Sequence, residues 1–291
     1  MDGVLGQNDG LLRLAVFAGV FLVMAAIELV RPKRRLTVSK ARRWLTNLGI
    51  AGTDMLVLRL MAMLAVPVAA VAAAYFAREH GLGLLNEVAW PYWIKVAIAL
   101  LVLDLAIWFQ HLVSHKVPIF WRLHRVHHAD RDIDVTTAVR FHPIEIALSM
   151  LWKILVVVLL GASPFAVFLF EVILNACAMF NHANIALPSW LDGVLRLFIV
   201  TPDMHRVHHS VVRNEHDRNY GFNLSLWDRL FRTYLAEPKA GQEGMTIGLT
   251  PYQTEAPTKF VWSLALPFRG TSGRSASESL QHMPSGGKSK G

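Results

Sequence analysis

The sequence uses one short histidine motif twice, a duplication that chance placement of 13 histidines does not explain. His124-Arg125-Val126-His127-His128 and His205-Arg206-Val207-His208-His209 carry the same five letters. His111 and His115 precede the first copy by a few residues. These three clusters hold eight of the 13 histidines, and the flanks of the two copies differ. The motif is therefore a local device that concentrates imidazoles, not the repeat of a fold unit.

The spacing of these histidines predicts a site for two metal ions. Positions i and i+4 of a helix share a face, so His111 and His115 can grip one ion. In each HRVHH copy the adjacent histidines diverge by about 100°, because a helix has 3.6 residues per turn. One copy can therefore offer nitrogens to two neighbouring ions. Eight nitrogens exceed what one tetrahedral or octahedral ion takes, and neutral imidazole suits iron, zinc and other first-row metals.

The composition indicates a membrane protein. Hydrophobic residues make up 54% of the chain and charged residues only 17%, which is more apolar than an ordinary soluble domain. We predict an all-α fold, a polytopic membrane helix bundle of four to five spans with a cytoplasmic histidine-rich helical cap. The expected spans are residues 11–30, 45–77, 94–109, 144–160 and 164–180, and the first is about 20 residues long, enough to cross a bilayer as a helix.

Charge supports an orientation for these spans. The net charge is +8, and seven Lys or Arg residues lie between Arg31 and Arg43, directly after the first span. This pattern favours a membrane-flanking signal over nucleic-acid binding and places that end in the cytoplasm. The first ten residues contain no basic segment, so we interpret residues 11–30 as an uncleaved span, not a signal peptide. Because each span takes the chain to the opposite side of the membrane, every histidine cluster is then expected at the cytoplasmic face.

The chain divides into three predicted regions. Residues 1–93 hold the N-terminal spans and a basic cytoplasmic loop, residues 94–237 form the catalytic domain, and residues 238–291 form a C-terminal tail. Gly270 to Gly291 is rich in Gly, Ser and Lys, a composition typical of disorder. The single cysteine, Cys177, excludes an intrachain disulfide framework and a thiolate metal site.

Two common metal motifs are missing from the sequence. It has no Glu-x-x-His of the carboxylate-bridged di-iron bundles and no HExxH of the zinc proteases. A histidine-dominated centre beside a lipid-facing bundle favours oxygen activation on a lipid. The alternative is a non-redox zinc-dependent membrane hydrolase or a metal transporter. A transporter is the weaker reading, because its histidines should lie within the spans and these lie at span ends and beyond.

The three clusters resemble the histidine boxes of the fatty acid hydroxylase superfamily, integral membrane enzymes that include the sterol desaturase family proteins. The resemblance covers about residues 95–237 and extends to Arg140-Phe141-His142-Pro143-Ile144-Glu145, to Thr201-Pro202-Asp203-Met204-His205 and to residues 219–231. The chain departs from it at Arg232, where glycine is usual. The motifs are specific for the superfamily and not for the substrate: sterol, hopanoid, carotenoid, fatty acyl chain and ether lipid are all open.

The resemblance implies a di-iron centre, O2 as co-substrate and an external electron donor, a ferredoxin or a b-type cytochrome with its reductase. It implies hydroxylation or desaturation of a lipid C–H bond in lipid biosynthesis, at an integral multi-pass protein of the bacterial inner membrane. His182 stands at the position of a further ligand, while His142 is either a ligand or supporting residue or an anchor for the fourth span. The predicted ligands are His111, His115, His124, His127, His128, His182, His205, His208 and His209.

Other polar residues near the boxes have two readings each. Asp104 lies two helical turns before His111 and could orient a ligand histidine or make a packing contact between helices. Arg125 and Arg206 could pair with nearby aspartates or lipid headgroups, but we favour a solvated face. The remaining histidines, His80, His216 and His282, are expected at the surface.

Overall fold

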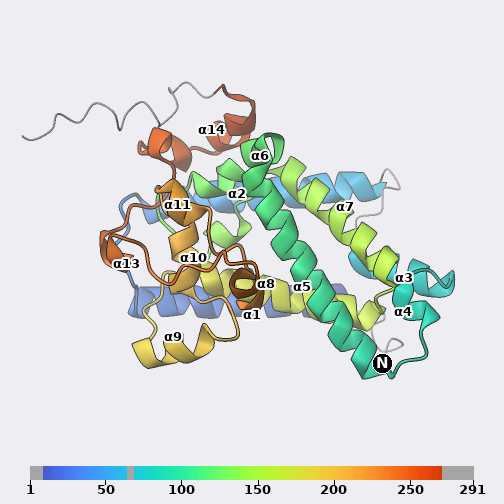
Figure 1. Ribbon diagram of the computed structural model, residues 1–291. Helices are drawn as coiled ribbons and strands as arrows, with labels where there is room; N and C mark the ends of the chain where they lie inside the picture. Colours follow the sequence, from blue (N-terminus) through green and yellow to red (C-terminus); the bar gives the residue numbers. More distant parts are fainter. Residues whose placement is uncertain (1–8, 64–68, 271–291) are drawn as a thin grey trace, which may run out of the picture.

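The computed structural model describes residues 9–63 and 69–270, and within these ranges the fold is all-α (Figure 1). The longer helices are α1 (Asp9–Val30), α2 (Lys40–Met63), α3 (Ala70–Glu79), α5 (Tyr92–Lys116), α6 (Pro118–His128), α7 (Pro143–Leu160) and α8 (Pro164–His182). The shorter ones are α4 (Leu84–Glu87), α9 (Ser189–Leu195), α10 (Pro202–His208), α11 (Arg213–His216), α12 (Leu226–Leu230), α13 (Gly241–Gly244) and α14 (Phe260–Ala265), with 3₁₀ turns η1 (Thr137–Val139), η2 (Thr250–Tyr252), η3 (Ala256–Thr258) and η4 (Leu266–Phe268). Within these ranges, β-type pairing of the backbone is limited to three isolated β-bridges.

Four of the described helices are long and apolar enough to cross a membrane, as predicted. They are Gly10–Val30 of α1, Tyr92–Lys116, Pro143–Leu160 and Pro164–His182. Helix α1 packs along α8, and α5 packs against both α7 and α8 (Figure 1). Large apolar side chains on these helices are exposed, among them Leu22, Leu29 and Leu159. A bundle that exposes such side chains along its length is built for lipid contact.

The expected span at residues 45–77 takes a different form. Helix α2 ends at Met63 and α3 begins at Ala70, while Pro67 lies outside the described residues. Helix α3 has only 10 residues, and α2 buries polar side chains such as Arg43, Asn47 and Asp54, so neither is apolar and long enough to cross by itself. Helix α2 contacts the histidine region through Arg43, and α3 packs against α7 and α8.

Sequence signals at helix starts explain why the bundle is divided where it is. Helices α6, α7, α8 and α10 all begin with proline, whose fixed φ suits the first helical position. Ser163 and Thr201 cap α8 and α10 with their side-chain oxygens, which accept from the backbone of Ala166 and Met204. These starts set the direction in which each histidine-bearing helix leaves its turn.

The turn between α7 and α8 requires glycine. Gly161 has φ 69° and ends α7 in the left-handed conformation. It also faces Gly83, where an added Cβ would lie 2.1 Å from the Gly161 nitrogen. The close approach locks the segment after α3 against the α7–α8 turn, at the end of the bundle far from the histidines.

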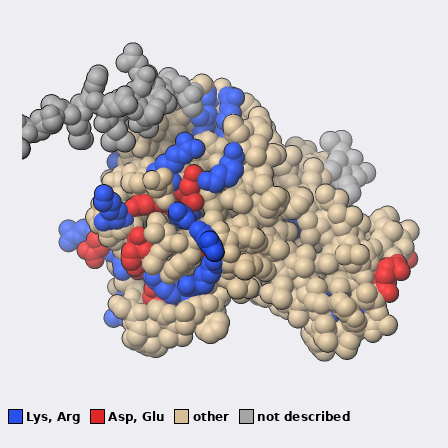
Figure 2. All heavy atoms as spheres, in the orientation of Figure 1, with Lys and Arg blue, Asp and Glu red and all other residues tan. Residues whose placement is uncertain are grey.

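The other end of the bundle carries a polar cap. Helices α6, α10 and α11 and residues 238–269 lie there, and charged side chains gather over this part while the long helices present a mostly uncharged surface (Figure 2). Residues 238–269 are ordered into short helices, and Leu249 and Leu266 pack with Ile50 and Val126 in an apolar core of the cap. Of the segment 270–291, which was predicted to be disordered, residues 271–291 lie outside the described residues.

Candidate metal centre

All nine predicted ligands meet at the junction of the bundle and the cap. Helix α5 supplies His111 and His115, α6 supplies the first HRVHH copy, α8 ends at His182, and α10 with the next residue supplies the second copy. Each of the nine side chains is buried, none exposing more than 7%. Burial of so many imidazoles without water is costly unless their nitrogens find partners.

The nine histidines separate into two groups. In each group, ligand atoms from every member lie within 4.8 Å of one another. The first group holds His111, His115, His124, His128 and His208, and the second holds His127, His182, His205 and His209. Each HRVHH copy contributes to both groups, which is the division of adjacent histidines that the helical spacing predicts.

Several imidazole nitrogens approach each other closely. The Nε2 atom of His182 lies 3.2 Å from Nε2 of His127 and 3.0 Å from Nε2 of His205. In the first group, Nε2 of His111 lies 3.1 Å from Nε2 of His124. Neighbouring ligands on one ion at about 2.0–2.1 Å are separated by ~3 Å, so this spacing fits nitrogens that share an ion.

Hydrogen bonds on the far side of four rings fix which nitrogen faces inward. The Nδ1 atoms of His111, His182 and His208 lie 2.7 Å from the carbonyl oxygens of Tyr220, Ala178 and Arg218, respectively. A carbonyl only accepts, so each Nδ1 carries the proton and Nε2 keeps its lone pair. Nδ1 of His124 is 2.6 Å from the Glu145 carboxylate. This arrangement is the usual support of metal-bound histidine.

The chemistry of the donor set fits metal binding. Both ring nitrogens of His115, His128 and His209 are buried without a hydrogen-bond partner, as is Nε2 of His208. Burial first, and the neighbouring imidazoles next, lower the pKa of His127, His128, His205, His208 and His209 well below the ordinary value. These rings are therefore neutral at physiological pH, the form that binds a transition metal.

Aromatic rings close the site. Phe141 stacks on His127 with 4.4 Å between centroids and 8° between planes. Phe222 lies near rings of both groups, 4.9 Å from His111 and 5.9 Å from His205. Tyr220 is fully buried with its ring 5.2 Å from that of His115. These rings give the histidine cluster a mainly apolar surrounding.

An ion-pair network braces the segment after the first motif copy. The buried Arg43 guanidinium contacts the Asp130 carboxylate at 2.6 and 2.8 Å and the Asp134 carboxylate at 2.5 Å. Burial alone would raise the pKa of Asp130, but the Arg43 charge and its hydrogen bonds bring that pKa down to about 2. Arg140 is also fully buried and bonds to Asn47 at 2.7 Å. Helix α2 is thereby fastened to the histidine region.

The other polar residues that the sequence analysis considered do not belong to either histidine group. Asp104 accepts from Trp227 at 2.8 Å, so it joins helices and orients no histidine. His142 caps α7, its Nδ1 accepting from the Ile144 backbone at 3.2 Å, and belongs to neither histidine group. The expected solvated face is wrong for Arg125 and Arg206, since both are buried. Arg125 donates to backbone carbonyls of the C-terminal segment, and Arg206 pairs with Asp203.

His216 is a second correction. His80 is exposed as expected, and His282 lies outside the described residues. His216 instead stacks on Trp121 of α6 with 5.5 Å between ring centroids, and its ring lies 5.9 Å from that of His115. A ligand atom of His216 also lies within 4.8 Å of His115 and Asp217 atoms.

Sequence reasoning missed one supporting residue. The Glu145 carboxylate bonds to His124, whereas the sequence analysis assigns no role to Glu145 and names it only within residues 140–145. Pro143 at the first position of α7 was the available signal, since it places Glu145 in the first turn at the histidine end.

A cavity of about 730 Å³ reaches the first histidine group. It lies among α1, α2, α5, α7 and α8, and its lining is predominantly apolar. His111 and His124 line it, whereas the second group does not. Large apolar cavities with a few polar groups are the usual form of small-molecule sites.

Comparison with known proteins gives the class of this region. Residues 96–233 match the fatty acid hydroxylase family. This region belongs to the fatty acid hydroxylase superfamily, in agreement with the motifs.

Particular relatives are hydroxylases or monooxygenases by name. The chain is 32% identical over 180 residues to ornithine lipid hydroxylase OlsE of Rhizobium tropici, covering 62% of this chain and 52% of that protein. It is 31% identical over 169 residues to human alkylglycerol monooxygenase, covering 55% of this chain and 34% of that protein. Mouse cholesterol 25-hydroxylase is 26% identical over 49% of this chain and 47% of its own length. The chain thus spans about half or less of these relatives, and no solved structure is significantly similar to it.

Proposed function

We propose that this protein is a di-iron, O2-dependent membrane oxidoreductase that hydroxylates or desaturates a C–H bond of a lipid. The observation that carries the proposal is the pair of buried all-histidine groups, one of which opens into an apolar cavity. The superfamily and the named activities of its relatives agree with a lipid hydroxylase. A lipid substrate enters from the bilayer, because the cavity is walled by membrane helices.

The ligands in this proposal are the nine histidines. His111, His115, His124, His128 and His208 hold one iron, and His127, His182, His205 and His209 hold the other. When bound, iron supplies the capacity to activate O2 for attack on an unactivated C–H bond. The protein holds Nε2 lone pairs inward through the backbone carbonyls and Glu145, and Phe141 and Phe222 exclude water.

Electrons come from a separate protein in this proposal. We place the site at the cytoplasmic face, because the basic segment 31–43 lies beside the histidine end. The backbone nitrogen of Ala186 donates to the Arg31 carbonyl at 2.9 Å, four residues past His182. Lys and Arg concentrate on the cytoplasmic side of membrane proteins. A ferredoxin or b-type cytochrome with an acidic face suits that basic surface.

Metal analysis tests the proposal. Protein purified with its native metal should contain about two irons per chain and consume O2 when given reductant and lipid. His80→Ala is the matched control, because this exposed histidine lies far from both groups and should leave iron unchanged. Zinc alone, persisting after anaerobic iron supplementation and without O2 uptake, would favour the zinc hydrolase or transporter and refute the di-iron enzyme.

A further inference from the structure

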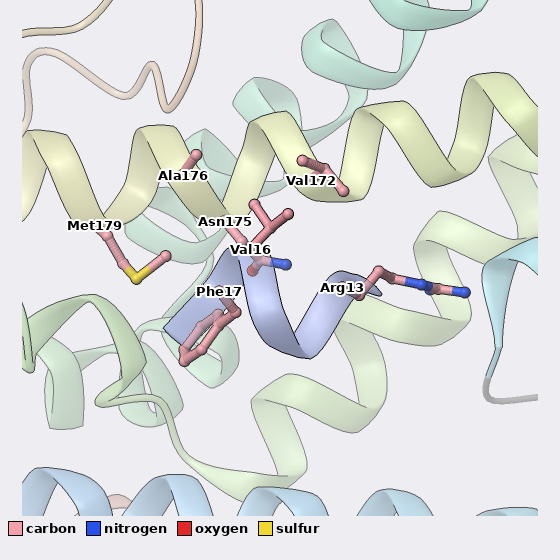
Figure 3. Close-up of a pocket in the computed structure, with 7 residues that line it drawn as sticks. All are labelled: Arg13, Val16, Phe17, Val172, Asn175, Ala176 and Met179. Carbon is pink, nitrogen blue, oxygen red and sulfur yellow. The ribbon is translucent and has the colours of Figure 1, made fainter. Parts of the chain in front are cut away.

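The cavity has a second polar end, distant from the histidines. Glu171 of α8 accepts from Arg13 of α1 at 2.5 Å through one oxygen and from Lys153 of α7 at 3.0 Å through the other. All three side chains line the cavity. Figure 3 shows Arg13 and Phe17 extending from α1 in different directions.

This cluster carries an uncompensated positive charge. Two cations share one carboxylate, and the side chains of Lys153 and Glu171 expose only 11% and 9%. The Nε atom of Arg13 is buried without a hydrogen-bond partner. All three residues lie in spanning helices, where ionisable groups are costly and mark functional sites. Apolar residues would join the helices at least as well, since buried ion pairs are weak contributors to stability.

Charge is distributed unequally along the cavity. Asp54 and Glu145 line it on the side of His124, and one Asp54 oxygen is buried without a partner. The basic cluster lies farther along the same helices. Lys153 follows Glu145 by eight residues of α7, which is about 12 Å, and Glu171 precedes His182 by eleven residues of α8, about 16 Å. An anion is therefore attracted to the end remote from the histidines.

We propose that Arg13 and Lys153 bind an anionic group of the substrate, a carboxylate or a phosphate, and so select amphiphiles over neutral lipids. The inference rests on the proposed function and names its substrate class. An anion held there leaves an apolar chain to run along the cavity toward His111 and His124. The oxidised carbon then lies about 12–16 Å from the charged group. Arg13 lies outside the family segment, so this selectivity belongs to the chain's own N-terminal helix.

Equilibrium binding to the purified full-length protein in lipid nanodiscs tests this. The probes are a radiolabelled long-chain fatty acid, ionised at alkaline pH, and the fatty alcohol of the same chain length. The wild type should bind the acid about tenfold more tightly, as expected for one charged hydrogen-bonded contact. Lys153→Met should remove that preference and Lys153→Arg should keep it, while alcohol binding stays within about twofold in both.

Glu171→Gln separates binding from a structural tie. Removing the shared carboxylate frees both cations, so acid binding should tighten while alcohol binding stays constant. If the cluster only joins helices, Glu171→Gln will weaken both probes equally. That result, or a wild type without preference for the acid, overturns the proposal. Thermal unfolding verifies that each variant folds, and if Lys153→Met does not, Glu171→Gln and Lys153→Arg still decide.

Because the experiment measures binding and not turnover, it tests the anion site separately from the proposed oxidation. Acid preference in a protein that lacks iron leaves the anion site standing and refutes only the oxidation. Iron and O2 uptake without acid preference refute only the anion site.

Discussion

The two HRVHH copies have the same sequence but divide their histidines in opposite ways. The first gives His124 and His128 to the five-histidine group and His127 to the four-histidine group. The second gives His205 and His209 to the four-histidine group and His208 to the other. One motif can therefore serve either position, and its orientation in the fold decides which.

The surroundings of the two copies also differ. The first copy is supported by side chains distant in sequence, through Glu145 and through the Arg43–Asp130 pair just after it. In the second copy, His208 bonds to the backbone carbonyl of Arg218, and Arg206 bonds to the side chains of Asp203 and Gln242. Side-chain supports can be removed by mutation, whereas the carbonyl cannot. The histidine support of the first copy, the Glu145 carboxylate, is thus the more vulnerable of the two.

Each copy gives two histidines to one group and a single histidine to the other. The largest effects should come from replacing these single histidines, His127 and His208. His127→Ala leaves three nitrogens in its group and His208→Ala leaves four. We expect both variants to lose at least ~100-fold in O2-dependent activity, with the greater metal loss in His127→Ala. Metal content and O2 uptake measure this. Retained activity in both variants contradicts the ligand assignment.

The ion pair beside the first copy should matter for stability. Arg43→Met leaves the buried carboxylates of Asp130 and Asp134 uncompensated, and the expected cost is about 3–5 kcal/mol of unfolding free energy. Arg42→Met is the matched control, because Arg42 is exposed and its loss should cost less than about 0.5 kcal/mol. Denaturant unfolding of the two variants decides. Equal stability would mean that the network does not brace the first copy.

Glu145 should act on the first copy alone. Glu145→Gln weakens the support of His124, and a loss of ~10–100-fold in metal affinity or activity is expected. Glu87→Gln, on an exposed short helix, serves as the control. Competitive metal titration checks the affinity. An unchanged affinity would show that His124 needs no charged partner.

The smallest effect belongs to a histidine outside both copies. His142→Ala removes the N-cap acceptor of α7 and should cost about 1 kcal/mol without changing metal content. His142→Asn should restore most of that stability, since asparagine is a good cap. Loss of metal in either variant would make His142 a ligand after all.

Sequence patterns predicted much of this molecule, for identifiable reasons. The division of each HRVHH copy between two groups follows from helical geometry alone, and the four long spans follow from continuous apolar runs. Residues 45–77 were expected as one span because an average hydropathy does not show which face of a helix is polar. Helix α2 buries Arg43 and Asn47, which bond to Asp130 and Arg140, and these partners are distant in sequence. Burial of Arg125 was equally unpredictable, because its partners Leu266 and Arg269 are carbonyls more than 140 residues away.

The unpartnered imidazole nitrogens have a consequence for how the protein matures in the cell. A chain that closes its bundle without metal buries several donors and acceptors with nothing to satisfy them, such as both nitrogens of His115, His128 and His209. An ion that binds only the folded form adds about 2.7 kcal/mol of stability at a hundredfold excess over its Kd. In the proposed di-iron enzyme, iron supply should therefore change how much of the protein folds and escapes turnover, before any substrate is encountered.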